Sequence, residues 1–96
     1  IAGKWNVTIK GPTGPQLTVL ELEQVDGKLT GQQTGQGVTT PISDARFDGS
    51  KIFWINHATK PMKMKVEFTG TVDGAQMSGK VKAGFMGSYP FTAVKA

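Results

Sequence analysis

The sequence predicts an all-β fold: a single eight-stranded antiparallel up-and-down barrel with minimal helix, spanning residues 1–96 as one domain. An apolar residue followed by Asp-Gly occurs three times, at Asp26-Gly27, Asp48-Gly49 and Asp73-Gly74. Asp-Gly between alternating apolar runs is the strongest short hairpin signal, because a type I′ turn requires positive φ at both central residues. Each intervening segment leaves room for two short strands and one further turn, and no segment has a helical period.

Composition limits the classes of function that are open to the chain. Its 96 residues are enough for one core, and no apolar run approaches the length of a spanning helix. The absence of cysteine excludes disulfides, a thiolate nucleophile and cysteine-based metal sites. The net charge of +4 comes from scattered basic residues that alternate with apolar ones, as on the wet face of half-buried strands. We therefore expect neither a nucleic-acid partner nor a membrane span.

The first half of the chain predicts four strands and two bulges. Trp5, Val7 and Ile9 alternate cleanly in the first strand, which ends at a loop over residues 11–15. In the second strand the apolar phase slips between Val19 and Leu20, which predicts a β-bulge. The third strand covers residues 28–33 and a loop spans residues 35–41. A second slip between residues 42 and 45 predicts a bulge in the fourth strand.

The fifth strand, residues 51–56, is apolar on both faces. A 48-residue shift aligns Phe53 and Ile55 with inward residues of the first strand. This analogy predicts that Phe53 and Ile55 face the core, and that Ile52 and Trp54 form an outer patch for a partner.

The last three strands alternate well. Residues 62–72 form the sixth strand, and the seventh follows the third Asp-Gly pair with Met77 and Val81 inward. The eighth carries Tyr89, Phe91 and Ala93. The inward residues of all eight strands are sufficient to fill a barrel of this size, so any ligand site is expected at its mouth.

The two ends of such a barrel differ. Successive turns of a meander alternate between the ends, so the Asp-Gly turns share one end with both termini. The loops at residues 11–15, 35–41, 57–61 and 83–90 gather at the other end and contain all five prolines. Binding residues tend to lie on irregular loops held by a rigid scaffold. The candidate binding residues are therefore those of the proline-bearing end, together with the tryptophan of the fifth strand: His57, Lys60, Phe85, Met86, Tyr89 and Trp54.

Two resemblances accompany this prediction. Gly3-Lys4-Trp5 resembles the Gly-x-Trp that opens lipocalins and avidins, where the tryptophan plugs the closed base and a late basic residue, here Lys95, lies across it. Nearly the whole chain is similar to small bacterial β domains with the pattern GxW, DGxLTG, DGxxxF, FxGxVDGxxMSGxV and a closing FTAxK. Such domains are appended to secreted amidohydrolases. The resemblance implies a calycin-like barrel with an accessory role and a periplasmic or secreted location.

Catalytic chemistry has little support in the sequence. His57 is the lone histidine, and spacing assigns it no partner. Turns or outer strand faces account for most carboxylates, and Asp44 beside the predicted bulge is interpreted as a local hydrogen-bond acceptor. We therefore expect no catalytic residues, no metal site and no cofactor.

The sequence thus predicts a non-catalytic binding or accessory domain that acts through its open end. Its expected partner is another protein or a covalently linked enzyme domain, since the chain starts at Ile1 rather than Met, like a processed product or an excised domain. One alternative is a carrier of a small apolar ligand inside the barrel. Another is a protease inhibitor, because a bacterial inhibitor class shares the eight-stranded barrel; that class uses its N-terminal segment, and only two residues precede the GKW motif here.

Overall fold

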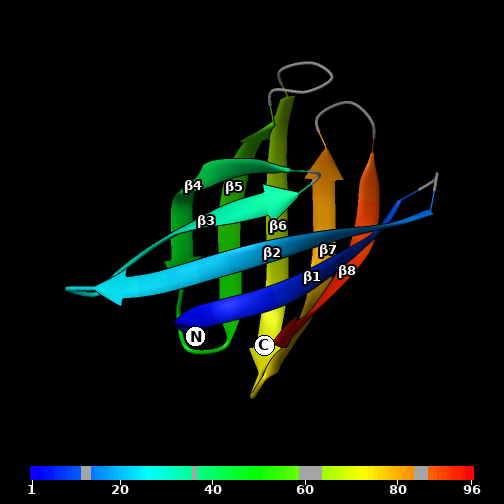
Figure 1. Ribbon diagram of the computed structural model, residues 1–96. Helices are drawn as coiled ribbons and strands as arrows, with labels where there is room; N and C mark the ends of the chain where they lie inside the picture. The colour runs from blue at the N-terminus through cyan, green and yellow to red at the C-terminus, as the bar shows by residue number, and fades with distance from the viewer. Residues whose placement is uncertain (12–13, 36, 59–63, 84–86) are drawn as a thin grey trace.

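The strands close into a barrel. The computed structural model describes residues 1–11, 14–35, 37–58, 64–83 and 87–96, and these contain strands but no helix. Each strand pairs antiparallel with the next, and the eighth pairs with the first, which confirms the predicted fold class (Figure 1). In the described ranges no helix is long and apolar enough to cross a membrane. The strands are β1 (Gly3–Gly11), β2 (Gly14–Val25), β3 (Lys28–Gly35), β4 (Val38–Phe47), β5 (Lys51–Ala58), β6 (Met64–Asp73), β7 (Gln76–Ala83) and β8 (Ser88–Lys95).

Both termini lie at the same end of the barrel, where β1 begins and β8 ends (Figure 1). Trp5 pairs with Lys95 in the closing ladder, and its indole Nε1 donates to the carbonyl oxygen of Ile1 at 2.9 Å. The lysine side chain runs along Gly3, where an added Cβ would lie 3.0 Å from its Cε. Lys95 was expected to lie across the Trp5 ring, but the cation–π contact found among the described residues is that of the Arg46 guanidinium, 5.4 Å from the ring centroid of Phe53.

The three Asp-Gly pairs mark turns of three different kinds. Asp26 and Gly27 both have positive φ, 52° and 78°, which confirms the predicted type I′ turn. In the third pair Asp73 still belongs to the ladder, opposite Gln76, and the turn residues are Gly74 and Ala75. Only the first of these has positive φ, as in a type II′ turn.

The type I′ prediction is therefore wrong for the third pair, and it is wrong for the second pair as well, which forms a wider turn. Phe47 pairs with Ile52, which leaves four residues between them. The Asp48 carboxylate accepts hydrogen bonds from the backbone N–H groups of Lys51 at 2.7 Å and Ser50 at 3.0 Å. These two bonds lower the pKa of Asp48 below its ordinary value.

Three aromatic rings occupy the middle of the barrel. Trp54 stacks on Phe68 with ring centroids 4.6 Å apart, and Phe91 meets both rings edge-on at 5.8 and 5.5 Å. Gly70 and Gly79 pair beside this cluster. A Cβ on Gly79 would collide with the backbone oxygen of Thr69, so only glycine allows these strands to approach so closely. The buried apolar residues that form one core are Trp5, Val7, Leu20, Leu22, Leu29, Ile52, Trp54, Phe68, Met77, Val81, Phe91 and Ala93.

The predicted orientation of β5 is wrong. Ile52 and Trp54 are 1% and 0% exposed within the core. Phe53 and Ile55 alternate with them on the opposite face, where the Arg46 guanidinium lies over the phenylalanine ring. Ile55 is nevertheless buried, at 5% exposed. The inward phase is fixed by partners on β6, since Trp54 pairs with Phe68 and can stack on it only from inside.

One of the two predicted bulges is present. The register of β2 with β1 and β3 runs without interruption, so Leu17 and Val19 simply lie on the outer face and Leu17 is 74% exposed. The slip in β4 is a true bulge: the register with β5 shifts between Ser43 and Arg46, and Asp44 has a φ of 52°. The extra residue bends β4 away from β3, the strand with which the first residues of β4 pair.

Three of the prolines lie in strands, whereas the sequence placed all five in loops. Pro15, Pro41 and Pro90 pair with Lys10, Gln32 and Lys80 respectively. Each lies near the start of its strand and pairs with one neighbouring strand only, so no second ladder requires its missing N–H. The other two prolines lie outside the described residues.

Candidate functional site

A hydrogen-bonded network of polar side chains lies inside the barrel near its proline-bearing end. At its centre is Gln33, a side chain from β3 that is 3% exposed. Its Nε2 donates to Oγ1 of Thr18 at 2.9 Å, and its Oε1 accepts from Nδ2 of Asn56 at 2.8 Å and from Nε1 of Trp54 at 3.3 Å. The hydroxyl of Thr40 donates to Oδ1 of Asn56 at 2.8 Å. Four strands thus contribute to one network.

The register explains why these side chains meet. Gln33 pairs with Leu20 on one side and with Thr40 on the other, and all three face the interior. Asn56 follows Trp54 by two residues on β5 and therefore shares its inward face. A buried amide requires partners for its donors and its acceptor, and this arrangement supplies them. In the described chain no buried side-chain nitrogen or oxygen is left without a partner.

The side chains of the network differ in how far they are exposed to solvent. Gln33 and Trp54 are buried, whereas Thr18, Thr40 and Asn56 are only partly buried. The hydroxyl and amide groups nearest the mouth therefore retain contact with solvent, above an aromatic floor. Mouths of β-barrels with a few convergent polar groups are frequent ligand sites.

The predicted site residues do not form one cluster. His57 is exposed on the outer face of β5 and pairs with Lys65, so it does not face the interior. Trp54 lies in the core beneath the network rather than on an outer patch. Tyr89 is partly buried, pairs with Val81 and shares the inward phase of Phe91. Lys60, Phe85 and Met86 lie outside the described residues.

Sequence reasoning missed Gln33 and Asn56. Both stand in phase with inward apolar residues, Leu29 for the first and Trp54 for the second. A polar residue in an inward phase was the available signal, because such a residue must find hydrogen-bond partners inside the barrel.

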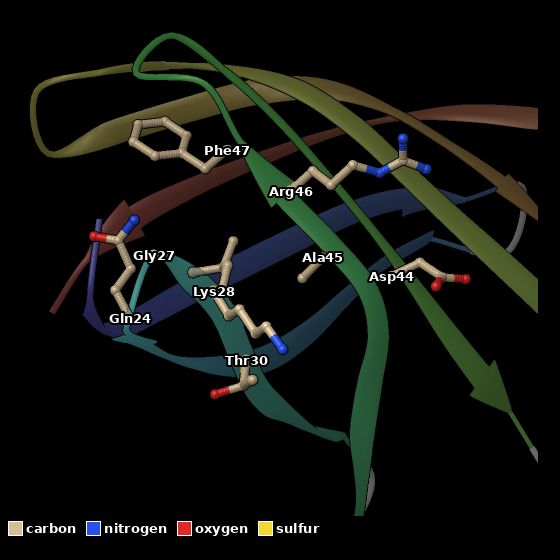
Figure 2. A pocket seen from close by; sticks show the side chains of 9 residues that line it. Gln24, Gly27, Lys28, Thr30, Asp44, Ala45, Arg46 and Phe47 are labelled. Carbon is tan, nitrogen blue, oxygen red and sulfur yellow. The ribbon is translucent and has the colours of Figure 1, made fainter.

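A second site opens in the barrel wall between β3 and β4. The two strands pair only over residues 32–35 and 38–41, and beyond these they diverge. The bulge at Asp44 lies in the diverging part. Between the strands is a cleft of about 380 Å³, and Figure 2 shows the side chain of Lys28 extending into it. Its lining residues are Gln24, Gly27, Lys28, Leu29, Thr30, Asp44, Ala45, Arg46 and Phe47.

A neighbouring depression of about 440 Å³ lies beside the turn between β4 and β5. It shares Arg46 and Phe47 with the cleft and adds Phe53 and Lys51. Arg46 thus stands between the two hollows, with its guanidinium over the Phe53 ring.

Acidic and histidine side chains are dispersed over the described ranges, where no three of them are grouped closely enough to hold a metal ion. The chain matches no family model, and no curated protein or solved structure is significantly similar to it.

Proposed function

We propose that the protein is a non-catalytic binding domain whose open end receives a polar group of a ligand or partner. The observation that carries the proposal is the network around Gln33, with two threonines and an asparagine partly exposed above it. These side chains offer both donors and acceptors on a rigid floor. Preorganised groups of this kind gain binding energy with little ordering cost.

The polar lining favours this function over carriage of an apolar ligand. An apolar molecule entering from this end would displace water from hydroxyl and amide groups without replacing their hydrogen bonds. The centre of the barrel is occupied by the rings of Trp54, Phe68 and Phe91. A hydrogen-bonding group that reaches only the rim avoids both costs.

An accessory role beside a linked enzyme domain is part of the proposal. It is supported by the resemblance of the GKW, VDGKLTG and closing FTAVKA segments to β domains appended to secreted bacterial amidohydrolases. The same resemblance supports a calycin-like type of barrel and a periplasmic or secreted location.

The test is a screen of small polar fragments followed by ¹H–¹⁵N correlation spectra of the labelled protein. We expect bound fragments to shift the side-chain amide signals of Gln33 and Asn56. Thr40→Val should weaken the binding of a confirmed fragment about tenfold, because it removes one uncharged hydrogen-bonding group from the rim. Thr92→Val is the matched control, since Thr92 is exposed on the outer face of β8. Fragments that shift only signals remote from the network would refute the proposal.

A further inference from the structure

The cleft between β3 and β4 exposes strand edges as well as side chains. Val25 and Lys28 close the two-residue turn at Asp26-Gly27, and such a closing pair is hydrogen-bonded. Lys28 and Thr30 therefore direct their backbone groups toward β2. Backbone groups alternate along a strand, so Leu29 directs its N–H and C=O the opposite way, toward β4. The pairing between β3 and β4 extends only from Gly35 to Gln32, so Leu29 has no pairing partner on β4.

Both edges of the cleft are held from behind. The part of β3 that β4 leaves unpaired is paired on its other side with β2, down to Lys28. β4 is paired with β5 on either side of the bulge. The opening is consequently a fixed feature of the register and does not require a strand to detach. Unpaired edges of this kind serve as templates for an additional strand.

The dimensions match a short extended segment. The unpaired half of β3 covers residues 28–31, about 10 Å at the usual strand rise of about 3.4 Å per residue. The cleft volume of about 380 Å³ lies within the range of sites that enclose small ligands. Leu29 and Phe47 provide apolar contact at the bottom, one from each edge.

The charges at the cleft favour an acidic segment. Lys28 extends into the opening, whereas Arg46 rises from the β4 edge and directs its guanidinium away from β3, over the Phe53 ring (Figure 2). Asp44 is the one carboxylate of the lining, so basic groups outnumber it by two to one. The net charge of +4 attracts an acidic partner over longer distances as well.

We propose that this cleft binds an extended acidic peptide segment of a partner protein, which adds as a strand against the free edge of β3. The segment places apolar side chains toward Leu29 and Phe47 and acidic side chains toward Lys28. This site lies in the barrel wall, apart from the network at the mouth, and its occupancy does not depend on the function proposed above.

The test uses acetylated and amidated pentapeptides in which glutamate alternates with valine, leucine or phenylalanine. Binding is followed by fluorescence polarisation and by amide signals of the labelled protein. We expect shifts at residues 28–31 and 42–47. A peptide with lysine in place of glutamate, and one with N-methylated apolar residues, should each bind at least about tenfold more weakly.

Lys28→Glu should also weaken binding about tenfold, whereas Lys80→Glu, on the exposed face of β7, should change it less than about twofold. The N-methylated peptide keeps the test decisive if the first variant folds poorly, because it alters the ligand alone. Equal binding of the N-methylated peptide, shifts confined to the mouth, or no binding at about 1 mM would each overturn the proposal. So would a dimer in solution in which these edges pair with a second copy of the chain.

Discussion

The indole Nε1 of Trp54 donates a hydrogen bond of 3.3 Å to the side-chain oxygen of Gln33 inside the barrel. This bond joins the aromatic core to the polar network. It also makes one glutamine oxygen the shared acceptor of two donors, because Asn56 binds the same atom. Loss of that oxygen would leave two donors without a partner.

Gln33→Leu should therefore lower the free energy of unfolding by about 2 kcal/mol, because buried unpaired donors cost about 1–3 kcal/mol. Urea unfolding followed by tryptophan fluorescence measures the change. Gln32→Leu is the control, since Gln32 is the exposed neighbour on the outer face, and we expect it to stay within about 0.5 kcal/mol. A change in Gln33→Leu no larger than the control would show that the network contributes nothing to stability.

The inward orientation of Trp54 has a spectroscopic consequence. In a Trp5→Phe variant the remaining indole is 0% exposed and stacked on Phe68, so acrylamide should quench its fluorescence poorly until the protein is unfolded. The unfolded variant in urea supplies the reference for full quenching. Quenching of the folded variant at the unfolded level would place Trp54 on the surface and contradict the structure.

Gly79→Ala should destabilise the barrel by more than about 2 kcal/mol, because the new methyl group would overlap the Thr69 carbonyl oxygen and force β6 and β7 apart. Thermal or urea unfolding gives the change. Ser78→Ala, the exposed position beside it, should have little effect. Equal stability of the two variants would contradict the close approach of β6 and β7 at Gly79.

Asp48 should make the free energy of unfolding depend on pH in the acid range. Because the folded-state pKa of Asp48 is lowered, its contribution is complete above the ordinary value of 3.8 and is lost as pH falls through the folded-state pKa. Asp48→Asn keeps an acceptor oxygen but cannot ionise. The difference in unfolding free energy between wild type and this variant, measured from about pH 6 to about pH 2, should shrink toward the acid end. A difference that stayed constant with pH would exclude the ionised carboxylate as its source.

The order of the strands was predictable because turns carry strong local signals. Asp-Gly pairs and alternating apolar residues located the strands and their antiparallel order, and a meander of this length closes as a barrel. The phase of β5 was not predictable by analogy, since it is decided by the Trp54–Phe68 stack across the ladder. A better signal was present: Lys51 and His57 share a face with Phe53 and Ile55, which argues for an outward face.

Less of the candidate sites could be predicted. Gln33 was not selected because a polar residue in a strand ordinarily indicates an exposed position, and its side-chain partners come from two other strands, β2 and β5. The cleft arises where β3 and β4 diverge. The bulge in β4 was predicted, but the position where β4 leaves β3 depends on pairing with β5, which no local pattern records.

The ladder between β1 and β8 has a consequence for how the chain reaches its native state. Trp5 and Lys95 lie at opposite ends of the sequence yet stand side by side, so nearly the whole polypeptide must be ordered before this pairing forms. Seven hairpin contacts are local and can appear early. We expect closure to be the last and slowest step, so that both edges of an open, seven-hairpin sheet are transiently available to other chains during synthesis.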